Sequence, residues 1–391
     1  MLVSVSKKKA AAYVVVAIAW AWVIASVWRG PVQYQFDFKS YYYAVKLFDA
    51  GGSPYDITTL REFGGSPNLL GFYYPLSTLS LLRPLGDLDY VSAHRVWIAL
   101  KAIALVMLLV IWKRCFLPAS GWLLPVVTLL AFHAATPWDV KMGNVTVFEQ
   151  VSLWAGFAFL MRARTTAFVV CVVLASLAKL LPIVFLLLLF LPALRSRAST
   201  VRALSGAAVF AGVTLLPFLA HPDLFDGYLR GLTNQHPPFK VNPSVMGIVD
   251  ELGRHRATAF LAVGGMRLVP IAAYYALLLL VSWRLLTRVA ASRNVRGIVL
   301  VAALFYALAA PRLIIYSCMI AIVPVLALLV PNAGKSKLGE YALLAALCVG
   351  GLAILPVPAG TIASDATPLL LLWGCWLALV TLERRGALAG V

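Results

Sequence analysis

The stretch FDFKSYYYAVKLFDAGGSPYD, residues 36–56, stands apart from the strongly apolar chain around it. It combines acidic residues, two lysines, four tyrosines and a Gly-Gly-Ser-Pro break, directly behind a hydrophobic segment that has the character of a membrane span. Asp37 follows that segment by only a few residues. A carboxylate at the edge of a span needs a physical reason, and the rest of the sequence supplies the context for one.

Composition indicates the class of protein. Apolar residues make up 62% of the 391 residues and the mean hydropathy is +0.90, whereas soluble domains are about half apolar. Apolar runs of about 17–20 residues, close to the length that crosses a bilayer, recur from one end of the chain to the other. We therefore predict an all-α, polytopic membrane protein that forms a single domain over residues 1–391.

Charge and cysteine usage argue against several other classes. The net charge is +18, but the basic residues lie in small clusters between apolar runs, without the interleaved aromatics of a nucleic-acid groove. The five cysteines are scattered without a CxxC pair, which favours neither a zinc site nor a disulfide framework. We expect no nucleic acid, metal or cofactor.

The basic clusters orient the chain in the membrane, because such clusters stay in the cytoplasm. We assign to the cytoplasm the clusters at 7–9, 113–114, 162–164, 195–202, 284–296, 335–337 and 384–385. The predicted spans are 10–28, 96–112, 119–136, 144–161, 200–219, 268–283, 297–310, 312–331, 338–357 and 366–382. With one further broken segment they make about twelve helical segments, and both termini are cytoplasmic.

Residues 165–194 form that broken segment. Cytoplasmic arginines bound it on both sides, and LAKLLP at 177–182 interrupts it with Lys179 and Pro182. Two helices of about 14 residues, each about 21 Å long, would enter the membrane and return. Lys179 would then lie at the rim of a recess in the outer half of the membrane. It is either a functional charge or a lysine that snorkels to the interface.

Two outer loops are large, at residues 29–95 and 221–267. In the first, residues 38–50 place five apolar or aromatic side chains near one helical face, before Gly51-Gly52 as a stop. A second amphipathic run, YYPLSTLSLLRPLGDL, follows at 73–88. Amphipathic helices of this kind lie in the plane of the membrane interface, and long structured loops usually carry function.

Five segments, in order, resemble glycosyltransferase family 87, the polyprenol-phosphate-mannose-dependent mannosyltransferases and their relatives. DFKSYYYAVKLFDAGGSPYD resembles the first-loop motif of the family, and YYPLSTLSLLRPLGDL resembles the Tyr-Pro-Pro-Leu segment that follows. MGNVTVFEQ at 142–150 resembles Gly-Gln-Val-Asn, with Asn144 in place of the glutamine. LAKLLP resembles the Lys-Pro break, and NPSVMGIV at 242–249 resembles the Asn-Gln-Ser motif.

The resemblance implies an integral-membrane glycosyltransferase of the C-type fold. A sugar, mannose in most of the family, would pass with inversion from a polyprenyl-phosphate donor to a glycolipid or envelope-glycan acceptor. The active site would face outward from the plasma (inner) membrane. A carboxylate suits the base that takes the acceptor proton, and Asp37 lies at the depth of a membrane-bound phosphate. Asp37 as the N-cap of the following helix is the structural alternative.

Cations are expected to stabilise the leaving phosphate, which departs ionised and needs no acid. Lys179 and Arg312 are the candidates, although Arg312, beside Pro311, also fits an interface anchor. Glu149, near the outer end of its span, would pair with a cation or face the cavity. The residues expected to contact substrate are Tyr41, Tyr42, Asn144, His236 and Tyr316, of which His236 also fits an ordinary solvated loop residue.

One segment departs from the family. Many members have Ser-Pro-x-x-Trp-x-His-His late in the chain, whereas APRLIIYSCM at 310–319 has no histidine and has Tyr316 about where one would fall. A proton relay through that histidine is then absent or uses another residue, such as His236. The departure leaves the sugar open between mannose, arabinofuranose and another hexose. Two other functions also fit: a lipid-linked-sugar flippase or transporter, and a non-catalytic assembly partner of an envelope enzyme.

Overall fold

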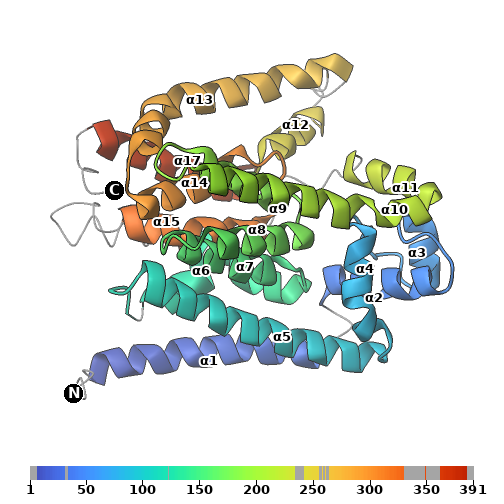
Figure 1. Ribbon diagram of the computed structural model, residues 1–391. Helices are drawn as coiled ribbons and strands as arrows, with labels where there is room; N and C mark the ends of the chain where they lie inside the picture. The colour runs from blue at the N-terminus through green and yellow to red at the C-terminus, as the bar shows by residue number, and fades with distance from the viewer. Residues whose placement is uncertain are drawn as a thin grey trace. The chain divides into compact units, whose positions relative to one another are not determined.

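The structure is a computed structural model that describes residues 7–30, 34–121, 123–233, 242–254, 258, 260, 264–329, 348 and 362–384. Within these residues every regular element is a helix, as predicted, and none is a strand. The elements in Figure 1 are α1 (Lys7–Arg29), α2 (Phe36–Asp49), α3 (Ile57–Phe63), α4 (Leu76–Gly86), α5 (Tyr90–Ile111), η1 (Trp112–Phe116), α6 (Leu123–Met142), α7 (Thr146–Leu160), α8 (Thr165–Ala178), η2 (Leu181–Phe190), α9 (Arg197–Leu215), α10 (Pro217–Ala220), α11 (Pro222–Thr233), α12 (Val245–Arg254), η5 (Gly264–Arg267), α13 (Leu268–Ala291), α14 (Val295–Ala309), η6 (Ile315–Ala321), α15 (Ile322–Pro324), η7 (Val325–Leu329) and α17 (Ile362–Arg384).

The chain divides into two compact units, each built from segments that are distant in sequence. The first unit comprises Met1–Ile111, Pro137–Leu189 and Ser196–Gln235, and the second comprises Trp112–Thr136, Phe190–Arg195 and His236–Val391. α6 contributes to both units. It is interrupted at Ala131–Ala134, where three consecutive residues have left-handed backbone angles that L-residues rarely adopt. The interruption lies just before the point where the chain passes from the second unit to the first.

Four helical stretches among the described residues are long and apolar enough to cross a membrane. They are Tyr90–Phe116, Leu123–Met142, Arg197–Ala220 and Gly264–Ala291, and each overlaps a predicted span. The predicted spans 10–28, 144–161, 297–310 and 312–331 correspond to shorter apolar helices, and 366–382 lies within α17. The predicted span 338–357 lies outside the described residues except for residue 348. The total of about twelve segments therefore stays a prediction.

The break predicted within residues 165–194 is confirmed. α8 ends at Ala178, Lys179 has an extended backbone with φ −150° and ψ 131°, and the tighter helix η2 follows. Pro182 explains the break, because in a continuous helix it has no amide to donate to the Ala178 carbonyl and its ring clashes with that carbonyl. Lys179 is consequently placed at a helix end and not in the middle of an apolar helix.

α2 begins two residues earlier than predicted and carries the expected buried face. Phe38, Tyr41, Tyr42 and Val45 are buried, and this face belongs to a core cluster that also contains residues of α4. Gly51 follows the helix with φ +83°, a left-handed conformation that glycine adopts at little cost. In the same unit α1 lies along α5, and α7 packs between α5 and α8 (Figure 1).

In the second unit α13, α14 and α17 pack against one another. Tyr274 and Tyr275 of α13 donate hydrogen bonds of 2.9 and 3.0 Å to the main-chain oxygens of Leu308 and Ala309. These oxygens belong to the last turn of α14, where carbonyl groups have no partner within the helix. The tyrosine pair therefore secures the end of α14 from which the segment at 310–319 begins.

Candidate active site

Asp37 lies in the first turn of α2, and its carboxylate meets the turn between α6 and α7. Its Oδ2 accepts a hydrogen bond of 3.2 Å from Nδ2 of Asn144. Gln35 occupies the N-cap position of α2 and its side chain makes no capping bond, so the alternative reading of Asp37 as the N-cap is wrong. The helix dipole favours an acidic group in the first turn. The Asp37 side chain is thus held at one carboxylate oxygen while it remains partly exposed.

The neighbours of Asn144 determine which way its amide points. Oδ1 accepts from the main-chain N–H of Thr146 at 3.1 Å and from the Thr146 hydroxyl at 2.7 Å. Lys179 Nζ donates to that hydroxyl oxygen at 2.6 Å, and because an ammonium group only donates, the hydroxyl proton is directed to Asn144. Nδ2 is left to donate to Asp37 and, at 3.0 Å, to the Tyr41 hydroxyl. The network therefore presents an N–H donor to the Asp37 carboxylate.

The paired tyrosines of α2 have different surroundings. The Tyr41 hydroxyl lies 2.9 Å from the Tyr74 hydroxyl, and the two rings meet edge to face. Burial, together with the nearby Asp37 charge, raises the pKa of Tyr74, so its hydroxyl stays protonated. The Tyr42 hydroxyl instead donates to the main-chain oxygen of Leu88 at 2.8 Å. Tyr41 joins the Asp37 network and Tyr42 supports loop packing; their contacts with substrate stay predictions.

Lys179 and Glu149 form an ion pair beside this network, with Nζ and Oε2 3.5 Å apart. Of the two alternatives predicted for Glu149, pairing with a cation or facing the cavity, the structure shows the pairing. The Lys179 side chain is 21% exposed and that of Glu149 only 2%. The break after α8 carries Lys179 to the start of α7, so the segments at 142–150 and 177–182 meet in one site. The Lys179 ammonium thus contacts both the Glu149 carboxylate and the Thr146 hydroxyl, and its role toward a phosphate stays a prediction.

Burial raises the pKa of Asp37 to about 6, although part of the side chain is exposed. The hydrogen bond from Asn144 and the charge of Lys179 oppose this increase, the Asp139 carboxylate adds to it, and the Lys101 ammonium opposes it. A carboxylate with a pKa near 6 is a stronger base than an ordinary aspartate and is still mainly ionised at neutral pH. The arrangement suits a group that accepts a proton under physiological conditions.

Sequence reasoning missed a second ion pair next to this network. Lys101 of α5 and Asp139 of α6 are fully buried, with Nζ 2.6 Å from Oδ2. Lys101 also donates to the main-chain oxygen of Asn144. A signal was present, because Lys101 falls inside a predicted span, and a charge in an apolar helix is costly unless it is paired. The sequence alone does not show which acid is its partner.

The close approach of α2 to the turn depends on Gly143. This residue has φ +74°, and a Cβ there would clash with Oε1 of Gln35 and lie 2.8 Å from Cβ of Phe38. Gln35 is fully buried, and its main-chain N–H donates to the oxygen of Lys141 at 2.8 Å while its side chain donates to that of Val140 at 2.6 Å. Only glycine allows this backbone conformation and this proximity together.

Arg312 belongs to the second unit, where two polar residues fix its chain neighbours. Asn242 Oδ1 accepts the main-chain N–H of Leu313 at 3.1 Å, and the Ser244 hydroxyl donates to the oxygen of Pro311 at 2.8 Å. The NPSVMGIV and APRLIIYSCM segments, which are distant in sequence, therefore contact each other. Arg312 lies between the two anchored residues and its side chain is partly exposed.

Two further residues expected to contact substrate are Tyr316 and His236. Tyr316 lies in η6 of the second unit and its ring is buried, at 7% exposure. His236 lies outside the described residues. The roles of both residues stay predictions.

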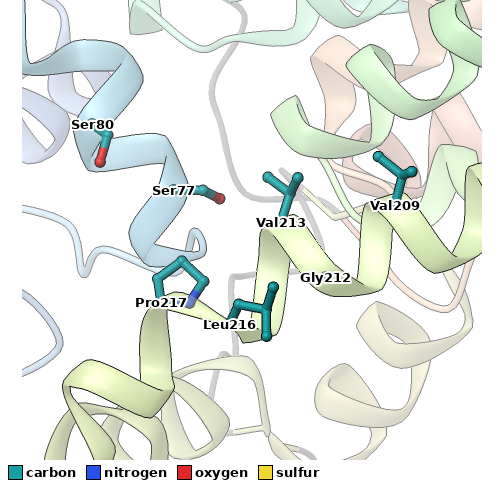
Figure 2. A pocket seen from close by; sticks show the side chains of 7 residues that line it. All are labelled: Ser77, Ser80, Val209, Gly212, Val213, Leu216 and Pro217. Carbon is teal, nitrogen blue, oxygen red and sulfur yellow. The ribbon is translucent and has the colours of Figure 1, made fainter.

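An open groove of about 700 Å³ lies between α4 and the end of α9, both in the first unit. Figure 2 shows two serines of α4 on one side and mainly aliphatic side chains on the other. α4 also packs against α2, the helix that carries Asp37. The residues that line the groove are Ser77, Ser80, Val209, Gly212, Val213, Leu216 and Pro217.

The apolar helices are those of a polytopic helical membrane protein, and the polar network of the first unit places a charged site around the Asp37 carboxylate. The family model of glycosyltransferase family 87 matches residues 72–311, which is more than half of the chain. The chain therefore belongs to glycosyltransferase family 87 and is a glycosyltransferase. The match includes Asn144 and Lys179, begins after Asp37 and ends one residue before Arg312. No curated protein and no solved structure matches the chain significantly.

Proposed function

We propose that the protein transfers a sugar from a polyprenyl-phosphate donor to a glycolipid or glycan acceptor, with inversion, and that Asp37 is the general base. The observation that carries the proposal is the Asp37 carboxylate, which is partly exposed, has a pKa raised to about 6 and accepts a hydrogen bond from an amide. Membership of glycosyltransferase family 87 supplies the class of reaction. The resemblance of the first loop to its family motif supports the choice of donor.

The reaction needs one proton acceptor and no acid. The acceptor hydroxyl oxygen forms a bond to the anomeric carbon while the bond from that carbon to the phosphate oxygen breaks. The electron pair of the broken bond leaves with the polyprenyl phosphate, and the hydroxyl proton passes to Asp37. Attack from the face opposite the phosphate inverts the anomeric configuration. Because the phosphate departs as an anion, a single carboxylate is sufficient.

Lys179 and Arg312 are the proposed groups that stabilise the departing phosphate. Support for Lys179 comes from its partial exposure and from the favourable effect of its charge on the ionised form of Asp37. Support for Arg312 comes from the anchoring of its two chain neighbours by Asn242 and Ser244. A guanidinium group can bind two phosphate oxygens at once, and preorganised cations act where charge develops in the transition state.

The lipid part of the donor is proposed to occupy the groove between α4 and α9. The lining of the groove is mainly apolar, and α9 forms most of a candidate span whose surface is largely exposed. Mannose is the proposed sugar because it is the commonest in the family that the sequence resembles. The proposed site faces outward from the plasma membrane. The basic cluster at 162–164 lies between α7 and α8, at the ends opposite the site, and the cluster at 195–202 lies at the end of α9 opposite the groove. Both clusters are assigned to the cytoplasm.

The test is transfer by purified protein in lipid nanodiscs. Polyprenyl-phosphate mannose, and in parallel the arabinofuranose and a second hexose form, would be supplied with a total glycolipid extract of the cell envelope. The proposal predicts an acceptor whose mass increases by one hexose or one pentose. In a parallel assay with the protein in sealed vesicles, movement of the donor across the bilayer without a covalent product would favour a flippase. The absence of both a covalent product and transport would favour an assembly partner. Either outcome, transport alone or no activity at all, would overturn the proposal.

A further inference from the structure

We propose that Lys101 and Asp139 are positioning residues, which hold the turn that carries Asn144 and thereby orient the Asp37 carboxylate for transfer. The inference rests on the proposed function of Asp37 as the base. Neither Lys101 nor Asp139 has a role in the reaction described above, yet both are charged and fully buried. The pair joins α5 to the end of α6, one element away from Asp37.

Two donors on one face of α5 hold consecutive carbonyl groups of the turn. Trp97 Nε1 donates to the oxygen of Gly143 at 2.9 Å, and Lys101 Nζ donates to the oxygen of Asn144. Trp97 and Lys101 are four residues apart, so their side chains project from the same face one helical turn apart. The spacing of the two donors on a rigid helix fixes the two carbonyl groups. Because the main chain of Gly143 and Asn144 is fixed in this way, the position of the Asn144 side chain is fixed as well.

Asp139 holds the turn from its other end. Its main-chain oxygen accepts the N–H groups of Gly143 and Asn144 at 3.0 and 3.3 Å. Its side chain accepts from Lys101 at 2.6 Å. Lys101 therefore links the Asp139 carboxylate to the Asn144 carbonyl and closes the turn with two charge-assisted hydrogen bonds, which are stronger than neutral ones.

The same face of α5 also positions the helix that carries the base. The Trp97 indole stacks on the Phe38 ring, with centroids 5.1 Å apart and planes 19° apart. Phe38 directly follows Asp37 in α2. Trp97 thus contacts Gly143, the residue before Asn144, and Phe38, the residue after Asp37. It thereby holds the chain on both sides of the 3.2 Å hydrogen bond between Asn144 and Asp37. α5 is the common reference from which the geometry of that bond is set.

The energetics of buried ion pairs indicate that the Lys101–Asp139 pair serves to place Asn144 and not to increase the stability of the fold. Removing two charges from water cancels most of their attraction, and apolar replacements of similar volume often leave stability unchanged or increased. A lysine inside an apolar helix adds to this cost in a membrane. An apolar pair would fill the same space but would not donate to the Asn144 carbonyl. The contribution specific to the Lys101–Asp139 pair is therefore the placement of Asn144.

The charged groups around Asp37 make this effect measurable. Lys179, Asp139 and Lys101 act on the carboxylate, and a fourth group, Glu149, is paired with Lys179. Lys101 lowers the pKa of Asp37 and Asp139 raises it, so the direct effects of losing both charges oppose each other. The main remaining effect of the double substitution on the Asp37 pKa then acts through the hydrogen bond from Asn144, which favours the ionised carboxylate. Loss of that bond moves the titration of Asp37 to higher pH.

The test is the double substitution Lys101→Met with Asp139→Asn, which avoids the unpaired buried charge that either single change leaves. We expect a folded protein whose kcat, measured with polyprenyl-phosphate mannose and the glycolipid extract, falls by about 10²-fold, the cost of a misplacement of about 1 Å. The infrared titration of the Asp37 carboxyl, taken as the difference from the matching Asp37→Asn protein, should move to higher pH. The control Lys113→Met removes a lysine that donates to the Pro118 oxygen at 2.7 Å, outside the turn, and should change neither quantity.

The variant Asn144→Ala separates positioning from a general effect on the fold. If Lys101 and Asp139 act through Asn144, adding their substitutions to Asn144→Ala changes neither kcat nor the Asp37 titration further. A wild-type rate and titration in the double variant would overturn the inference, as would full additivity with Asn144→Ala. Failure of the double variant to fold would also overturn it, because the pair would then serve stability. Wild-type transfer by Asp37→Asn would instead overturn the proposed function, and the infrared titration would still decide the positioning.

Discussion

Replacement of Asp37 by Asn is expected to stabilise the protein at neutral pH while it removes the proposed base. The pKa of Asp37 is raised to about 6 in the folded protein, mainly by burial, from an ordinary value of 3.8. Folding therefore opposes ionisation of this carboxyl group. An asparagine has nearly the same shape, carries no charge and can still accept the hydrogen bond from Asn144 through its side-chain oxygen. The variant retains the contact and avoids the cost of a buried charge.

The size of the effect follows from linkage between protonation and folding. Below about pH 4 the carboxyl group is protonated in both states, so it contributes no difference. Between about pH 4 and 6 the unfolded chain ionises first and the folded protein loses stability relative to the variant. Above pH 6 the difference is constant. A pKa of about 6 in place of 3.8 corresponds to about 3 kcal/mol, an upper limit because the side chain is partly exposed.

The assay is thermal unfolding of wild type and Asp37→Asn in the same detergent from pH 4 to 8. The difference in Tm should be small at pH 4, grow to about pH 6 and then remain level. Asp56→Asn is the matched control, because bonds from the Thr59 hydroxyl and the Thr58 amide lower the pKa of Asp56 below its ordinary 3.8, so its titration changes stability only below about pH 4 and the Tm difference of this variant should stay nearly level from pH 4 to 8. A Tm difference for Asp37→Asn that is independent of pH would refute the account of a buried, proton-accepting carboxylate.

Three further predictions concern rate and local structure. The rate of transfer should rise with pH on an acid limb near pH 6, because only ionised Asp37 accepts a proton; a rate that is flat or falls from pH 5 to 8 would contradict this. Lys179→Met combined with Glu149→Gln removes the exposed cation without leaving an unpaired carboxylate, and turnover should fall by about 10²–10³-fold; near-normal turnover would remove the phosphate role. Gly143→Ala should lower Tm, because left-handed backbone costs a non-glycine residue about 1–2 kcal/mol and the new Cβ clashes with Gln35; an unchanged Tm would show that the turn can shift.

Local signals in the sequence predicted the elements that carry the site. The aromatic periodicity of residues 38–50 located α2 within two residues, and Pro182 located the break beside Lys179. The charge of Glu149 inside a span predicted either a cationic partner or a place facing the cavity, and the 3.5 Å contact with Lys179 shows the first. These features depend on neighbours in sequence or on the general cost of a charge in an apolar helix, so they are visible without coordinates.

Features that depend on long-range packing were not predictable from the sequence. The Lys101–Asp139 pair joins residues 38 positions apart, and the sequence shows neither that α5 meets the end of α6 nor that Lys101 reaches the Asn144 carbonyl. The orientation of the Asn144 amide follows only from the bonds of Thr146 to it. The interruption of α6 at Ala131–Ala134 precedes Pro137, which has no amide to donate to the His133 carbonyl and clashes with it in a continuous helix, but the predicted span 119–136 ran through this position unbroken.

Single-turnover transfer by Asp37→Asn tests the central claim most directly. Donor affinity and the rate of sugar transfer should be measured on the same purified variant, with polyprenyl-phosphate mannose bound before the acceptor is added. The account predicts donor affinity close to wild type, because the proposed phosphate contacts lie elsewhere, and a rate of transfer lower by about 10²–10⁴-fold, the usual contribution of a general base. Transfer within a few fold of wild type would contradict the assignment of Asp37 as the base.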